Sequence, residues 1–108
     1  MAIRYSDTFK RQLKRLSRKY RRVRSDLQPF IEQLEAGQTP GDQIQGTGHT
    51  VYKVRIANTD AQRGKSGGYR VIYYLKQQDD ILLITLYSKT EQADIETDDV
   101  IRIIQEEA

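Results

Sequence analysis

The chain has 108 residues, of which 37% are hydrophobic and 31% charged, and its formal net charge is +3. It contains no cysteine and a single histidine, His49, so the composition excludes a disulfide framework and a thiolate metal site and predicts neither a bound metal nor a cofactor. No apolar run approaches the roughly 20 residues of a membrane span and no secretory signal opens the sequence, so we expect one cytoplasmic domain over residues 1–108.

The N-terminal segment predicts a short strand followed by a helix. Ile3 and Tyr5 alternate with polar residues as in a strand, and Ser6 or Asp7 is a suitable N-cap for the helix. The apolar stripe of this helix comprises Phe9, Leu13, Leu16 and Tyr20. Their spacing places all four side chains on one side of the helix, where they can face a core.

The remaining sides of this first helix are strongly basic. Residues 10–24 contain nine Lys or Arg and no acid, a distribution that suits contact with an RNA backbone or with ribosomal RNA; the alternative is an ordinary solvated helix face. The candidate RNA-binding or ribosome-binding residues are Lys10, Arg11, Lys14, Arg15, Arg18, Lys19, Arg21 and Arg22, together with Lys65 in a later loop. Binding of this kind should weaken steeply as the salt concentration rises.

A second helix is expected from about Ser25 to Ala36, close enough to the first to form a helical hairpin. Pro29 is expected near its first turn, where a missing N–H is least harmful. Gly37 directly follows the helix, and Pro40 lies beyond it to prevent continuation. The core face of this helix comprises Leu27, Phe30, Ile31 and Leu34.

Residues 38–48, rich in Gly, Thr, Gln and Pro, are expected to form a loop before a series of strands. The strands are expected at about Val51–Ala57, Tyr69–Lys76 and Ile81–Tyr87. A tight turn at Asp79 and Asp80 should pair the last two antiparallel, and a short amphipathic helix capped by Thr97 should follow. The predicted fold is α+β, with an N-terminal helical hairpin packed on a small twisted antiparallel sheet, helices on one face and the order β-α-α-β-β-β-α.

Side-chain alternation along the first two of these strands separates an apolar face from a basic one. The apolar side comprises Tyr52, Val54, Ile56, Tyr69, Val71, Tyr73 and Leu75. Lys53, Arg55 and Arg70 then project from the other side, if the apolar residues pack on the helices. Antiparallel pairing can gather these cations in one patch, with Tyr74 at its edge. The alternative is that they are ordinary solvent-facing cations on a half-exposed sheet.

Three motifs make the chain resemble a known family: YKVRI at residues 52–56, GKSGGYRVIYY at residues 64–74 and LYSKTE at residues 86–91. With the basic helical hairpin, they are similar to the RelE/ParE superfamily of toxins from type II toxin–antitoxin pairs, and most similar to its RelE/HigB-like branch. The resemblance implies an endoribonuclease that cuts mRNA in the ribosomal A site without a metal and so inhibits translation. It implies the ribosome, mRNA and a cognate inhibitory antitoxin as partners, and leaves a higher toxin–antitoxin assembly open.

The resemblance also assigns catalytic residues. Lys53 and Arg55 match the paired basic residues of the family's K-x-K/R strand. Arg70 matches the arginine of its G-Y-R segment, and Lys89 matches the basic position just after the last strand. The resemblance therefore implies a catalytic set drawn from two strands and from the position that follows the last strand.

The last motif departs from the family pattern. Well-studied family members carry an arginine directly after the lysine of this motif and a tyrosine several residues later. Residues 90–95 contain neither. Tyr87 or Tyr74 is the candidate to supply a hydroxyl instead.

RNA cleavage without a metal uses the ribose 2′-OH as the nucleophile on the adjacent phosphate. It needs a base, a proton donor for the 5′-oxygen and cations for the developing charge. Arginine forks bind phosphate oxygens bidentately, so Arg55 and Arg70 are expected to clamp the phosphate. A lysine crowded by other cations loses its proton more readily, so Lys53 is the candidate base, and Lys89 is a further clamp or the acid.

Two other functions are compatible with the sequence. Relatives on the ParE side of the superfamily inhibit DNA gyrase, and a nucleic-acid-binding module without catalysis would also be basic. The four catalytic candidates favour cleavage, because a gyrase-binding protein does not need them.

Overall fold

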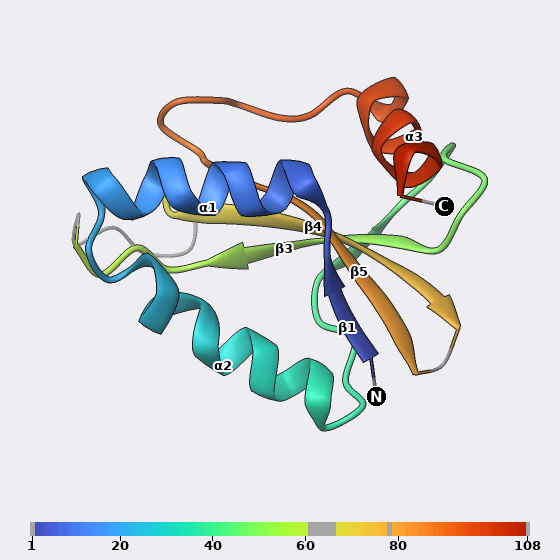
Figure 1. Ribbon diagram of the computed structural model, residues 1–108, viewed down its shortest axis with the longest axis horizontal. Helices are drawn as coiled ribbons and strands as arrows, with labels where there is room; N and C mark the ends of the chain where they lie inside the picture. The colour runs from blue at the N-terminus through green and yellow to red at the C-terminus, as the bar shows by residue number, and fades with distance from the viewer. Residues whose placement is uncertain (1, 61–66, 78, 108) are drawn as a thin grey trace.

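Helices cover both faces of a sheet in the computed structural model of the chain, which describes residues 2–60, 67–77 and 79–107 (Figure 1). The described elements are β1 (Ala2–Tyr5), α1 (Asp7–Lys19), α2 (Val23–Glu35), β2 (Asp42–Ile44), β3 (Val51–Ile56), β4 (Tyr69–Gln77), β5 (Asp80–Ser88) and α3 (Thr97–Glu106). The strands lie in the order β1-β5-β4-β3-β2 across the sheet. The predicted α+β class and the helical hairpin are confirmed.

The sheet is mixed, which corrects the prediction of a purely antiparallel one. β1 runs parallel to β5, with Ile3 beside Ile81, while the other neighbouring strands are antiparallel. At the end of β1 the amide of Ser6 donates to the carbonyl of Leu83 (3.0 Å). Parallel strands need a long connection between them, and everything from α1 to β4 supplies it here.

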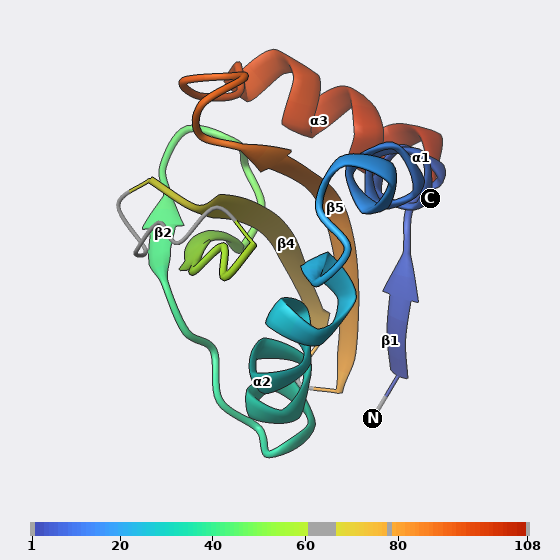
Figure 2. The ribbon, with the colours of Figure 1, turned by 90° about the vertical axis from the view of Figure 1, so that its left-hand side faces the viewer.

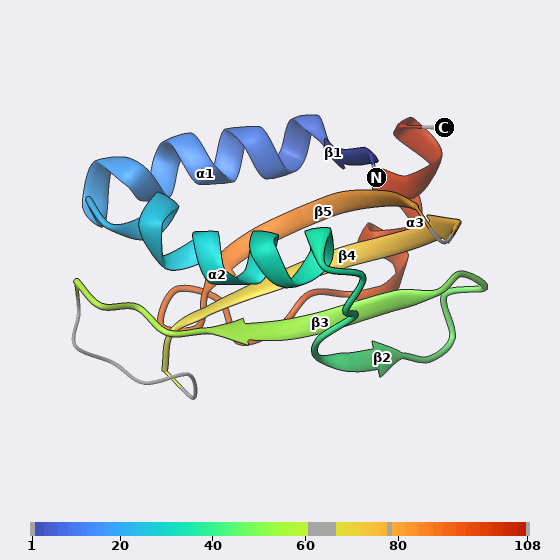
Figure 3. The same cartoon turned by 90° about the horizontal axis from the view of Figure 1, so that it is seen from below.

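A short strand, β2, lies within the segment predicted to be a loop. It pairs antiparallel with β3, with Gln43 beside Tyr52, and forms one edge of the sheet (Figure 3). Gly41 (φ +99°) leads into β2 so close to β3 that a Cβ there would overlap the carbonyl oxygen of Lys53. A strand of only three residues is too short to be recognised from hydrophobic periodicity. With β2 included, the order of the described elements is β-α-α-β-β-β-β-α.

The N-cap of α1 is the buried Ser6. Its Oγ accepts a hydrogen bond from the amide of Phe9 (2.9 Å) and donates one to the carbonyl of Ile84 (2.5 Å). This one side chain therefore fixes the start of the helix against β5. Phe9 and Leu16 of the predicted apolar stripe are fully buried, and its other two members pack against the same core, which confirms the stripe.

The second helix, α2, begins at Val23 rather than at Ser25, because buried Val23 extends its apolar face. Pro29 therefore lies in the second turn, which corrects its predicted place near the first. Its ring removes the hydrogen bond that residue 29 would otherwise donate to the carbonyl of Ser25. The end is as predicted: Gly37 (φ +85°) follows the helix, and its amide donates to Leu34 (3.0 Å).

Apolar side chains form one core on each face of the sheet. α1 and α2 cover the first core, which contains all seven residues of the predicted apolar side. α3 covers the second core, which includes Val51, Ile72, Leu82, Ile84, Val100, Ile103 and Ile104. The sheet thus lies between α2 and α3 (Figure 2), which corrects the expectation of helices on one face. The reason is that β4 and β5 carry apolar side chains on both of their faces.

The last helix, α3, is amphipathic as predicted but starts differently. Glu96 occupies its N-cap position without a side-chain capping bond, and Thr97 is the first helical residue. Asp98 and Asp99 in the first turn supply the negative charge that stabilises a helix N-terminus. Within the ranges that the structure describes, no helix is long and apolar enough to cross a membrane.

Candidate active site

A row of polar side chains crosses three neighbouring strands on the face opposite the helical hairpin. In the register of the sheet, Arg55 on β3 lies beside Arg70 on β4, and Arg70 lies beside Tyr87 on β5. Directly paired residues share a face and stand about 5 Å apart. Lys53 lies two residues from Arg55 on β3 and so projects on the same side. The sheet thus brings together three of the four predicted catalytic residues.

Arg70 is almost fully buried within this row, at 5% exposure, whereas Arg55 is exposed. Its Nη1 donates to the carbonyl of Tyr69 (3.2 Å). Burial is the main cause that lowers the pKa of Arg70; Arg55 lowers it further, while Tyr87 and Asp94 act in the opposite direction. A buried guanidinium beside a second one favours an anion, because the anion offsets both the desolvation and the repulsion.

A carboxylate from the segment between β5 and α3 lies against the row. Asp94 Oδ1 accepts hydrogen bonds from Lys53 Nζ (3.3 Å) and from the hydroxyl of Tyr87 (3.3 Å). The amide of Ile95 donates to the same oxygen (2.8 Å) and is the largest cause that lowers the pKa of Asp94; partial burial opposes this effect, and the two side chains reinforce it. Burial, followed by Asp94, raises the pKa of Tyr87 to about 12. At neutral pH the pair is a carboxylate and a protonated phenol.

Hydrophobic periodicity does not mark Asp94 as a site residue. It is one of nine acids in residues 77–108, and it lies in a segment without periodicity. The signal that points to it is the departure of residues 90–95 from the family pattern. Where an expected arginine and tyrosine are missing, a polar residue of the same segment is the first replacement to consider.

Lys89 directly follows β5, which ends at Ser88. Its amide donates to the carbonyl of Gly68 (2.9 Å) and so continues the pairing of β4 with β5. Its Nζ donates to the carbonyl of Ala93 (2.6 Å), in the same segment as Asp94. In the part of the chain that the structure describes, no three His, Cys, Asp or Glu side chains are grouped as metal ligands. The described site consists of cations around a carboxylate and a phenol.

Tyr74, the other candidate for a hydroxyl, lies away from the row. It is four residues beyond Arg70 on β4, roughly 13 Å along the strand. Its ring packs edge-on against His49, with 5.1 Å between the ring centroids, and it borders the core under α3. The register therefore places Tyr87 directly beside Arg70, whereas Tyr74 lies beside Val51.

The sequence matches the family model of the RelE toxin of the RelE / RelB toxin-antitoxin system over residues 7–107. The chain belongs to the RelE toxin family. It is thus the toxin of a toxin–antitoxin system, and a cognate antitoxin of the RelB type is its implied partner. Toxins of this family generally cleave mRNA and are typically endoribonucleases.

The basic helix α1 of this RelE-family toxin packs on the opposite side of the sheet from the row. The eight RNA-binding residues predicted on this helix and just after it are all exposed. Arg15 and Lys19 both pair with Glu91 (3.1 and 3.8 Å), so the segment that carries Asp94 also contacts α1, past which it runs in Figure 1. Lys65, the ninth predicted residue, lies outside the described residues.

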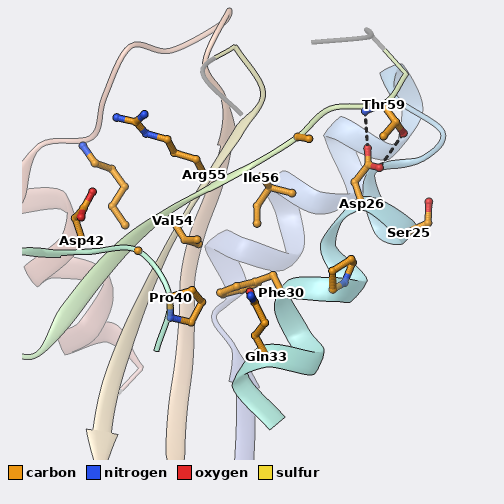
Figure 4. A pocket seen from close by; sticks show the side chains of 14 residues that line it. Ser25, Asp26, Phe30, Gln33, Pro40, Asp42, Val54, Arg55, Ile56 and Thr59 are labelled. Atoms are coloured by element: carbon orange, nitrogen blue, oxygen red, sulfur yellow. Dashed lines mark hydrogen bonds between the residues drawn. The ribbon is translucent and has the colours of Figure 1, made fainter. Parts of the chain in front are cut away.

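A pocket of about 620 Å³ lies between α2, the chain entering β2, and β3 (Figure 4). Figure 4 shows Arg55 pointing away from Val54 and Ile56, so the arginine borders the pocket from the far side of the strand. Asp26 fixes one wall, since it accepts hydrogen bonds from the amide (3.0 Å) and the hydroxyl (2.8 Å) of Thr59. The pocket adjoins the row across the part of β3 that follows its pairing with β2, but it is not lined by Arg70 or Tyr87.

Proposed function

We propose that this RelE-family toxin is an endoribonuclease of the RelE/HigB-like branch that cleaves mRNA in the ribosomal A site. The observation that supports this most is the row of Arg55, Arg70 and Tyr87 across three strands, with Lys53 on the same face. Two guanidinium groups one strand apart can bind the oxygens of the same phosphate. Such donors, placed in advance of the reaction, stabilise the charge that develops when RNA is cleaved.

The proposed reaction is attack by a ribose 2′-oxygen on the adjacent phosphate, with no part for a metal. Arg55 and Arg70 bind the phosphate oxygens that do not leave. Because Arg70 is nearly buried, its position is fixed before RNA arrives, so little reorganisation is needed in the transition state. Lys53 and Lys89 add positive charge, and Lys89 is the candidate donor of a proton to the leaving 5′-oxygen.

The exposed cations of α1 are proposed to bind the backbone of ribosomal RNA. They lie on the other side of the sheet from the row, so they do not compete with it for the cleaved strand. Glu91 offsets the charge of Arg15 and Lys19, which leaves the cations nearer the start of the helix as the stronger anchor. The place of action that follows is the cytoplasm, where ribosomes translate.

Gyrase inhibition, the alternative function, finds less support in these residues. A protein that binds gyrase needs a complementary surface, not a nearly buried arginine beside a second arginine and a phenol. A nucleic-acid-binding module without catalysis would likewise be served by exposed cations such as those of α1. The burial of Arg70 is the feature that both alternatives leave without a purpose.

Primer extension on an mRNA that is translated in vitro tests the proposal. The toxin should give codon-phased cuts that require ribosomes. Arg70→Ala should lower cleavage about 100-fold or more, as the removal of one preorganised donor does. The matched control is Arg102→Ala, which removes an exposed arginine of α3 that pairs with Asp99 and Glu106, and it should cut like the wild type.

Circular dichroism melts of both variants show whether either change has unfolded the protein. A folded Arg70→Ala variant that keeps full activity contradicts the proposal. Intact mRNA together with blocked DNA supercoiling would support gyrase inhibition instead.

A further inference from the structure

The carboxylate of Asp94 reaches the catalytic face from a loop and engages the surrounding residues through one of its two oxygens. Oδ1 accepts the hydrogen bonds from Lys53, from Tyr87 and from the following backbone amide. Oδ2 has no hydrogen-bond partner in residues 2–60, 67–77 and 79–107. Since the side chain is 64% exposed, Oδ2 is open to a ligand bound over the row.

We propose that Asp94 is the catalytic base that accepts the proton of the ribose 2′-OH. This inference rests on the proposed ribonuclease function, and it gives the role to a residue outside the three motifs that the chain shares with its family. A base must be unprotonated, fixed in position and within reach of the hydroxyl whose proton it takes.

The sheet fixes where Asp94 stands relative to the proposed phosphate clamp. Its two side-chain donors come from β3 and β5, the strands on either side of β4, which carries Arg70. The charge of Asp94 also acts on Arg70, as does the charge of Arg55. The carboxylate therefore lies over the arginine that would hold the scissile phosphate. A 2′-OH adjacent to that phosphate arrives at the same place.

The groups that face Asp94 keep it ionised. They are Lys53 from β3, Arg70 from β4 and Tyr87 from β5. The amide of Ile95 is the first cause of the lowered pKa of Asp94, and Lys53 and Tyr87 add to it against the effect of burial. The carboxylate is thus unprotonated at the pH of translation and can accept a proton.

The same contact argues against Lys53 as the base, the role expected from its crowding by other cations. Lys53 Nζ lies 3.3 Å from the carboxylate oxygen and donates a hydrogen bond to it, so the lysine is directed to Asp94 and not to a 2′-OH. Lys53 then has two other roles: it orients Asp94, and it adds positive charge beside the phosphate.

The proposed step moves one proton onto Asp94 and one proton from Lys89. Asp94 takes the 2′-OH proton as the 2′-oxygen forms its bond to phosphorus, and the bond from phosphorus to the 5′-oxygen breaks. The leaving 5′-oxygen takes a proton from the ammonium of Lys89, while Arg55 and Arg70 hold the charge of the phosphorane. The products are a 2′,3′-cyclic phosphate and a 5′-hydroxyl. Proton exchange with water restores Asp94 and Lys89.

Tyr87 has a positioning role in this scheme. Its hydroxyl donates to Oδ1 of Asp94 (3.3 Å), and with its pKa raised to about 12 it stays protonated and keeps donating. It therefore holds one oxygen of the carboxylate while the other accepts the proton.

Asp94→Asn tests the inference, because the amide keeps the shape and one accepting oxygen of the carboxylate but is not a base. The measurement is single-turnover cleavage of mRNA on programmed ribosomes, with ribosome binding measured in parallel. Cleavage should fall about 100-fold or more, the range for removal of a general base, while binding stays unchanged. The control for charge is Asp98→Asn, which removes an exposed acid of α3 and should cleave at the wild-type rate.

The variant Tyr87→Phe distinguishes a catalytic role of Asp94 from a structural role in which Asp94 only holds its loop in place. This change releases the same carboxylate oxygen but leaves the base in place, so it should retain most of the cleavage that Asp94→Asn abolishes. Equal reductions in the two variants would overturn the inference. Cleavage by Asp94→Asn at the wild-type rate would also overturn it. Faster cleavage would overturn it too, because it would show that Asp94 competes with the phosphate for the surrounding cations.

The test also separates this inference from the function on which it rests. If the wild type cleaves, Arg70→Ala does not and Asp94→Asn does, then only the assignment of the base fails. If the wild type leaves ribosome-bound mRNA intact, the proposed function fails and the inference fails with it.

Discussion

Two buried tyrosines of β4 differ in a single hydrogen bond. Tyr69 and Tyr73 are both fully buried on the hairpin side of the sheet, and burial is the main cause that raises the pKa of each phenol. The hydroxyl of Tyr73 donates to the carbonyl of Pro40 (2.5 Å). The hydroxyl of Tyr69 has no partner among the residues described. A buried hydroxyl without a partner has given up its bonds to water and gained nothing in return.

Replacing each tyrosine by phenylalanine should therefore have different effects. Tyr73→Phe should lower the free energy of unfolding by about 1 kcal/mol, because it leaves the carbonyl of Pro40 without a donor. Tyr69→Phe should leave that free energy unchanged or raise it. Urea unfolding at neutral pH measures both, and each variant is the other's control. A larger decrease in Tyr69→Phe than in Tyr73→Phe would contradict this account.

The residues of the site differ in how far the sequence could predict them. Lys53, Arg55 and Arg70 lie on strands, where a period of two and antiparallel pairing determine which side chains share a face. Asp94 lies in a segment with no period, and its place depends on the path of the chain from β5 to α3. A contact of that kind comes from tertiary structure, so no local pattern predicts it. The sequence offers both Tyr87 and Tyr74 as the source of a hydroxyl, and the register of β4 with β5 selects Tyr87 by placing it beside Arg70.

The elements of the fold follow the same rule. The helical hairpin and the three long strands have strong periodicity, and their predicted positions are confirmed to within a few residues. β2 has three residues and depends on pairing with β3, and the parallel place of β1 depends on a partner far along the chain. The side on which α3 packs was also unpredictable, because an amphipathic helix does not specify which apolar face of a sheet it will cover.

The start of α1 depends on the side chain of Ser6, so a single substitution tests how this helix is held. Ser6→Ala should lower the free energy of unfolding by about 1–2 kcal/mol, because it removes the cap and the donor to Ile84 together. Ser25→Ala is the control: its exposed hydroxyl donates only to the carbonyl of Arg22, so the change should be close to neutral. Thermal or urea unfolding measures both. Equal effects would show that the cap does not hold the helix to β5.

Basic and acidic residues are concentrated in different segments of the chain, and the fold brings some of them together as ion pairs. Residues 1–24 carry a net charge of +9 and residues 77–108 carry −7. The acidic segment meets the basic surfaces where Glu91 pairs with Arg15 and Lys19 and where Asp94 pairs with Lys53. The basic face of α1 is thus partly neutralised by Glu91, and the face that carries the row is partly neutralised by Asp94. The first turns of α1 lie outside these ion pairs. The cations in these first turns are the ones expected to dominate long-range attraction to RNA.

The salt dependence of ribosome binding tests this distribution. With Lys10 and Lys14 both changed to Gln, the slope of log affinity against log salt should become shallower by about 1 for each lysine that binds a phosphate in the wild type. Lys76→Gln removes an exposed cation near the end of β4 and should leave the slope nearly unchanged. Identical slopes for all three proteins would show that α1 does not bind the RNA backbone.

We propose that the row of Arg55, Arg70 and Tyr87 cleaves ribosome-bound mRNA. The most direct measurement is the single-turnover rate of mRNA cleavage on programmed ribosomes, compared between the wild type and folded Arg70→Ala. Cuts by the wild type should end in a 2′,3′-cyclic phosphate, and the rate for the variant should be about 100-fold or more lower. Intact mRNA with the wild type, or equal rates for the two proteins, would contradict it.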